Sequence, residues 1–206
     1  MSATIDYYFS LISPYAYLGH DRLLDIAEKH GAAIRYFPVN LGAVFSQTGG
    51  LPLPLRHVAR QDYRWLELQR WREVRKLPLN LRPAHFPTDQ TLADCTAIIL
   101  AQSGGKVAEF AHRVFRACWE LDRDIADEHV IAGILDDLGE HKGDLITAAK
   151  SEEVRAIYAE NAKQAAKAGV FGSPCYVLNG EVLWGQDRLE LLDDALTSGR
   201  APYRPL

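Results

Sequence analysis

The segment from Thr4 to His20 constrains the fold most, because it takes the backbone from a strand directly into a helix. Ile5, Tyr7 and Phe9 alternate with more polar residues, the two-residue period of a strand with one buried face. Ser13 is a preferred N-cap residue, and the proline after it fits the first helical position, where an N–H would have no partner. The pattern predicts a serine hydroxyl at a helix N-terminus, where free N–H groups favour negative charge.

Two interpretations of Ser13 stay open at this point: it only caps the helix, or its hydroxyl also contacts a ligand. The helix is expected to run to about Lys29, where Gly31 supplies a stop signal. Residues 33–39 are rich in strand formers and indicate a second strand. A strand, a helix and a second strand in this order predict a right-handed βαβ unit with parallel strands.

The bulk composition is that of one well-packed domain, or of one domain that carries an insertion. The chain has 206 residues and a net charge of −4, which argues against nucleic acid as a partner. It shows neither a signal-peptide pattern nor an apolar run of membrane-spanning length, so we expect a cytoplasmic protein without a membrane partner.

Three cysteines, Cys95, Cys118 and Cys175, are widely spaced, and no C-x-x-C motif occurs. This spacing indicates neither a disulfide framework nor a thiolate zinc site, and no metal site is predicted. We expect all three to be buried free thiols.

The pattern of apolar, charged and proline residues changes after the second predicted strand. Residues 41–50 form a short apolar segment, and residues 56–76 read as a basic amphipathic helix whose charged face is expected to be solvated. Its aromatic residues Tyr63, Trp65 and Trp71 are each expected to pack in the core, although a hydrophobic substrate site is the alternative. Residues 77–87 are proline-rich and extended, and several helices are predicted between residues 91 and 168.

Strand signals return near the end of the chain. Residues 175–178 and 181–184 flank Asn179-Gly180, a strong hairpin signal, and a helix is predicted from Asp187 to Leu196. The order of elements is β-α-β, a long helical stretch, and α-β-β-α. This order predicts an α/β, thioredoxin-like fold of the DsbA-like type, in which residues 1–40 and 166–206 form a discontinuous domain and residues 41–165 an inserted all-helical domain.

Two further features lie at the expected ligand edge of such a fold. The Ser173-Pro174 bond precedes the third strand, and we predict that it is cis, the alternative being a trans proline at the entry to a strand. The Ser173 backbone would then be free to pair with an extended peptide. Asp187 places a carboxylate at the start of the last helix, where it caps the helix, faces a ligand ammonium, or does both.

Several motifs together resemble those of the kappa-class glutathione transferases and their bacterial relatives, the 2-hydroxychromene-2-carboxylate isomerases. The resemblance covers essentially the whole chain and rests on the order and spacing of the motifs. They are Ser13–Gly19 (SPYAYLG), Leu41–Phe45 (LGAVF), Asp62–Trp71 (DYRWLELQRW), Phe171–Pro174 (FGSP) and Gly185–Leu192 (GQDRLELL).

The resemblance implies a glutathione site. Ser13 stands where thioredoxin-type oxidoreductases carry a nucleophilic cysteine, so it would donate a hydrogen bond to the glutathione thiolate and act as the catalytic residue. Ser173 would pair with the cysteinyl backbone, and Gln186 and Asp187 would hold the γ-glutamyl end. Gly50 replaces an asparagine common in the family, and Arg60 lies near a lysine of its relatives. The implied glutathione-binding residues are Ser13, Pro14, Tyr15, Gly50, Arg60, Ser173, Pro174, Gln186 and Asp187.

The activity implied by this resemblance is glutathione-dependent cis/trans isomerisation of an aromatic conjugated carboxylate by reversible thiolate addition. The resemblance also implies glutathione and a small aromatic carboxylate as partners, and a homodimer. Two alternatives remain: a kappa-class transferase or peroxidase, and a non-catalytic thioredoxin-fold protein that binds peptides beside Pro174.

Overall fold

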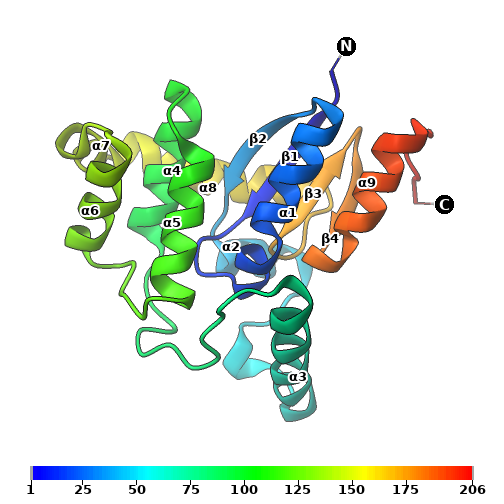
Figure 1. The fold of residues 1–206 in the computed structure, drawn as a ribbon, viewed down its shortest axis with the longest axis horizontal. Coiled ribbons are helices and arrows are strands. Elements are labelled where there is room, and N and C mark those ends of the chain that lie inside the picture. Colours follow the sequence, from blue (N-terminus) through cyan, green and yellow to red (C-terminus); the bar gives the residue numbers. More distant parts are fainter. Residues whose placement is uncertain (1, 206) are drawn as a thin grey trace.

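The first strand, β1, lies inside a four-stranded sheet in the computed structural model, which describes residues 2–205 (Figure 1). In order across the sheet the strands are β2 (Ala33–Pro38), β1 (Thr4–Phe9), β3 (Cys175–Leu178) and β4 (Glu181–Trp184). β2 runs parallel to β1, whereas β3 is antiparallel to both β1 and β4. Tyr7 lies opposite Tyr176, so segments from the two ends of the chain share one sheet, as the order of elements predicts.

Helices cover both faces of this sheet. On one face Ile5, Tyr7 and Phe9 pack in a core cluster with α1 (Pro14–His30) and α9 (Leu189–Ser198). On the other face Tyr8 packs in a second cluster with α2 (Leu41–Thr48) and α8 (Glu152–Lys167). The expectation that the first strand has one buried face is therefore wrong, since Tyr8 is also buried.

The helices of residues 91–149 form a layer beside β2, and the helix of residues 58–75 lies below the sheet in the view of Figure 1. α4 contacts β2, and α5 contacts α1. The helices of this middle part are α2 (Leu41–Thr48), α3 (Val58–Arg75), α4 (Thr91–Ser103), α5 (Val107–Trp119), α6 (Glu128–Leu138), α7 (Lys142–Ala149) and α8 (Glu152–Lys167). Two short 3₁₀ turns, η1 (Leu53–Leu55) and η2 (Gln186–Arg188), connect elements. None of the described helices combines the length and apolar character needed to cross a bilayer.

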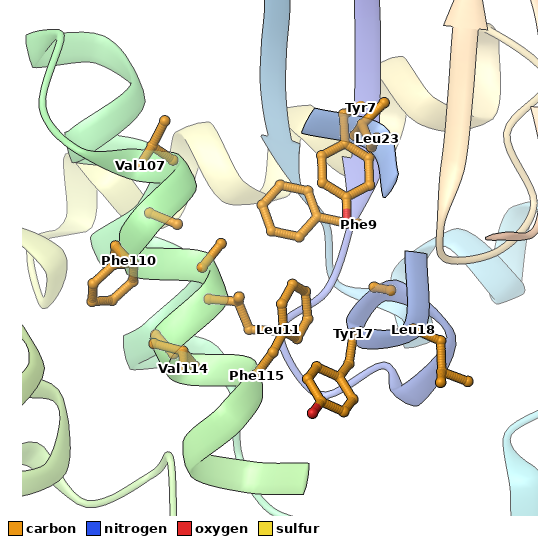
Figure 2. Close-up of a cluster of buried hydrophobic side chains, with 14 of the residues drawn as sticks. Tyr7, Phe9, Leu11, Tyr17, Leu18, Leu23, Val107, Phe110, Val114 and Phe115 are labelled. Atoms are coloured by element: carbon orange, nitrogen blue, oxygen red, sulfur yellow. The ribbon is translucent and has the colours of Figure 1, made fainter. Parts of the chain in front are cut away.

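A continuous core joins the sheet to the helical layer (Figure 2). Phe115 of α5 lies with its ring centroid 6.3 Å from that of Phe9 and 6.4 Å from that of Tyr17. Phe110 and Val114 of the same helix are buried in the same cluster. The core thus contains residues of both predicted domains, and the division at residues 41 and 165 stays a prediction.

Both ends of α1 agree with the capping signals in the sequence. The start of the last helix does not. The Ser13 side chain accepts the Ala16 N–H, and Gly31 ends α1 in the left-handed conformation with φ 58°, as predicted. The last helix, however, begins at Leu189. Asp187 lies before it in the η2 turn, so the prediction that a helix starts at Asp187 is wrong.

Candidate active site

Ser13 and Ser173, from opposite ends of the chain, are in direct contact. Ser13 is only 5 % exposed, and its Oγ donates a hydrogen bond of 3.2 Å to the backbone oxygen of Ser173 while it accepts the Ala16 N–H at 3.2 Å. The hydroxyl that the sequence places at a helix N-terminus therefore lies beside the backbone that precedes Pro174. The structure brings these two predicted site residues together.

The Ser173-Pro174 peptide bond is cis, which confirms the prediction. The oxygen of Pro174 accepts the Gly185 N–H at 2.9 Å and so ties the start of β3 to the η2 turn. A second cis bond, Phe86-Pro87, lies in the extended segment before α4, where the sequence analysis did not expect one.

Asp94, in the first turn of α4, organises the loop that carries Ser13. Its carboxylate accepts the Leu11 N–H at 2.9 Å, the Ser10 hydroxyl at 3.1 Å and the Tyr158 hydroxyl at 2.6 Å. Ser10 in turn donates its N–H to the Ser173 Oγ at 3.1 Å. A continuous set of hydrogen bonds thus links α8 and α4 to both serines of the site.

Burial controls the charge of Asp94. The side chain is 0 % exposed, and this desolvation raises its pKa to about 7 although the three hydrogen bonds act in the opposite direction. Asp94 was not among the site residues predicted from the sequence. The available signal was a carboxylate among apolar residues of α4, since Ala93, Cys95 and Ala97 beside it are also fully buried.

The predicted γ-glutamyl residues have different surroundings. Gln186 is 1 % exposed, and Arg75 of α3 donates to its Oε1 at 2.9 Å and to its backbone oxygen at 3.1 Å. Asp187 is more exposed, and its carboxylate accepts from the neighbouring Arg188 at 2.7 Å. Arg75, which no sequence motif indicated, therefore fixes the position of η2 against α3.

The other predicted residues lie along α1 and the segment from α2 to α3. Tyr15 lies in the first turn of α1, directly after Pro14, and is partly buried. Arg60 lies exposed in the first turn of α3. Among the described residues, neither Arg60 nor Gly50 has a hydrogen bond to Ser13. A Cβ atom at Gly50 would lie 2.4 Å from Cδ1 of Phe45, so any side chain there requires the Phe45 ring to move.

The cysteines of the chain are buried free thiols, as the sequence predicts. Burial raises the pKa of Cys95 to about 11 and the pKa of both Cys118 and Cys175 to about 12. Thiolate character at neutral pH is therefore suppressed at all three sulfurs.

The fold agrees with the comparisons with known proteins. The model of the DSBA-like thioredoxin domain matches residues 4–197. A 2-hydroxychromene-2-carboxylate isomerase of Pseudomonas sp. (strain C18) is 30% identical, over 96% of this chain and 91% of its own. A glutathione S-transferase kappa 1 of Caenorhabditis elegans is 24% identical, over 93% of this chain and 90% of its own.

A solved structure of a 2-hydroxychromene-2-carboxylate isomerase superposes with a TM-score of 0.83 at 28% identity, and the match covers 95% of both chains. The family model and the isomerase relatives each span nearly the whole chain. The chain therefore belongs to the DSBA-like thioredoxin domain family and, within it, to the 2-hydroxychromene-2-carboxylate isomerases.

Proposed function

We propose that this protein is a glutathione-dependent isomerase that interconverts the cis and trans forms of an aromatic conjugated carboxylate. The observation that carries the proposal is the contact between Ser13 at the start of α1 and Ser173 beside the cis proline. Burial raises the pKa of all three cysteine thiols of the chain, which supports a reacting thiolate supplied by a bound molecule. The related kappa-class transferase supports glutathione as that molecule.

The residues at the site suit a thiolate with a peptide backbone. In the described structure the Ser13 hydroxyl donates to the Ser173 oxygen. A peptide N–H of the ligand can take that oxygen as its acceptor, and the Ser13 hydroxyl is then released to donate to a sulfur. The first turn of α1 adds free N–H groups and the positive end of the helix dipole. Asp187 offers a partly exposed carboxylate to an ammonium group.

Glutathione, when bound, would supply a thiolate that adds reversibly to the conjugated double bond, so that rotation becomes possible before the double bond re-forms. The part of the protein is to lower the pKa of that thiol and to hold both reactants. Ser13 does the first through one charge-assisted hydrogen bond, which is shorter and stronger than a neutral one. The set of hydrogen bonds around Asp94 fixes the loop from which Ser13 acts.

Reduced glutathione is expected to stabilise the folded protein. At a concentration ten times its Kd, mass action adds about 1.4 kcal/mol, which for a chain of this length raises Tm by roughly 3–6 °C. The measurement is a thermal-shift series, with dithiothreitol as a control thiol that lacks peptide and carboxylate groups. A Tm that moves equally with both thiols, or with neither, would contradict a glutathione site.

Asp187→Asn is expected to weaken glutathione binding by about tenfold, because it removes the negative charge opposite the ligand ammonium. Isothermal titration calorimetry measures this directly. Asp194→Asn, at an exposed carboxylate of α9, is the matched control and should bind like the wild type. Equal affinity in both variants would remove Asp187 from the site.

The fate of glutathione separates the isomerase from its transferase alternative. An isomerase leaves the glutathione concentration unchanged while a benzylidenepyruvate-type acid changes geometry, whereas a transferase consumes glutathione with chlorodinitrobenzene. Following absorbance and free thiol together in each assay distinguishes the two. The homodimer and the cytoplasmic location expected from the sequence remain predictions, which light scattering and cell fractionation test.

A further inference from the structure

Arg64 of α3 is a buried cation that has no counter-ion within residues 2–205 as described. It is only 9 % exposed, although the sequence predicts a solvated basic face for this helix. Among the described residues it has no ion pair and no hydrogen bond. Its guanidinium carbon lies 5.5 Å from the ring centroid of Trp65 and 5.5 Å from that of Phe86. Aromatic faces attract a cation, but they do not replace the hydration that a buried charge has lost.

The groups around Arg64 favour an anion from outside the chain. Burial lowers the pKa of Arg64, and repulsion by the charged Arg56 acts in the same direction, whereas the nearby Tyr15 hydroxyl acts in the opposite one. Burial raises the pKa of Tyr15 to about 12, so this hydroxyl stays protonated and can donate. Arg56 and Tyr15 thus lie within electrostatic range of Arg64, and no described carboxylate is paired to either arginine.

Glu67, three residues further along the same helix, is already engaged. Glu67 accepts from Arg70 at 2.7 Å and from the Trp71 Nε1 at 3.1 Å, so its carboxylate is held by its own neighbours. Tyr15 follows Ser13 by two residues, and α1 contacts α3. The unpaired guanidinium thus lies beside the start of the helix that carries the proposed thiolate site.

We propose that Arg64, with Tyr15 and Arg56, forms a carboxylate subsite, and that the rings of Trp65 and Phe86 hold the Arg64 guanidinium in place for it. This proposal rests on the proposed function, because it assigns the group that orients the aromatic acid beside Ser13. Glutathione also carries carboxylates, so the experiment has to separate the two sources.

The test uses trans-cinnamate as the probe, cinnamamide as its neutral counterpart, and calorimetry in the absence of glutathione. Wild-type protein should bind cinnamate at least about tenfold more tightly than cinnamamide. Arg64→Met should lose this difference, and Arg64→Lys should keep part of it, because a lysine retains the charge but not the planar fork. Arg72→Met, at a more exposed arginine of the same helix, should behave like the wild type.

Two further readouts make the outcomes distinct. Glutathione affinity should be unchanged in Arg64→Met, and its loss with cinnamate binding intact would assign the subsite to glutathione instead and overturn the proposal. The Tm of Arg64→Met should equal or exceed that of the wild type, because the variant removes an unpaired buried charge at similar side-chain length. A lower Tm together with unchanged cinnamate binding would make Arg64 a structural residue.

The proposed function and this subsite can fail separately. If cinnamate binding depends on Arg64 but no acid is isomerised with glutathione, the subsite stands and the isomerase assignment fails. If the protein isomerises its acid substrates and Arg64→Met keeps the same KM as the wild type, the isomerase assignment stands and the subsite fails.

Discussion

Replacing Ser13 by alanine is expected to reduce isomerase turnover at neutral pH by about ten- to a hundredfold, with little change in glutathione affinity. A hydrogen bond to a charged group contributes roughly 1.5–3 kcal/mol, and its loss raises the pKa of the bound thiol. Binding changes little because Asp187 and the Ser173 backbone are proposed to carry most of it. The measurement is the thiolate absorbance of bound glutathione against pH, together with turnover, for wild type and variant.

The control for this prediction is a second serine N-cap. Ser151 caps α8 by accepting the Val154 N–H at 3.3 Å, away from the site. Ser13→Ala and Ser151→Ala should both lose about 1 kcal/mol of stability as caps, but only the first should change the thiol titration. Coincident titration curves for wild type and Ser13→Ala would show that Ser13 is a cap alone.

Asp94→Asn is expected to remove a pH dependence of folding stability worth about 3 kcal/mol between pH 5 and pH 8. The carboxyl of an unfolded chain ionises near pH 3.8, whereas the folded value is about 7. Between these values the folded protein binds more protons than the unfolded chain. The contribution of Asp94 to stability is therefore full below about pH 4 and falls as the pH rises to about 7.

Urea unfolding at pH 5 and at pH 8 gives the change in unfolding free energy between the two pH values for each protein. The change in Asp94→Asn is then subtracted from the change in the wild type. Other titrating groups contribute equally to both proteins and cancel. Asp25→Asn, at an exposed position of α1, should keep the pH dependence of the wild type. If the wild type and Asp94→Asn lose the same stability between pH 5 and pH 8, the Asp94 carboxyl is already ionised at the lower pH.

The sequence predicts the parts of the site that depend on local patterns. The Ser13 cap is visible because caps depend on residue type within one turn, and the prediction for the Ser173-Pro174 bond follows from its place directly before a strand. The hairpin at Asn179-Gly180 is visible for the same reason. All three features are present in the structure.

The remaining parts of the site depend on contacts between distant segments. Asp94 touches Ser10 and Leu11 across more than eighty positions of sequence, and no local signal fixes such a contact. The basic helix α3 shows the same difficulty. The pattern predicts a solvated charged face and buried aromatics, but Arg64 is buried and Tyr63 is 56% exposed. Trp65 and Trp71 do pack against the core, as expected.

The position of Asp94 also limits how this protein can open for its ligands. A hinge that swings the helical layer away from the sheet would withdraw the acceptor of the Ser10 hydroxyl and the Leu11 N–H. It would also separate the rings of Phe9 and Phe115, which share one core. Such a motion would dismantle the loop that carries Ser13 each time a ligand entered. The hydrogen bonds of Asp94 and the shared core therefore oppose a hinge motion between the sheet and the helical layer.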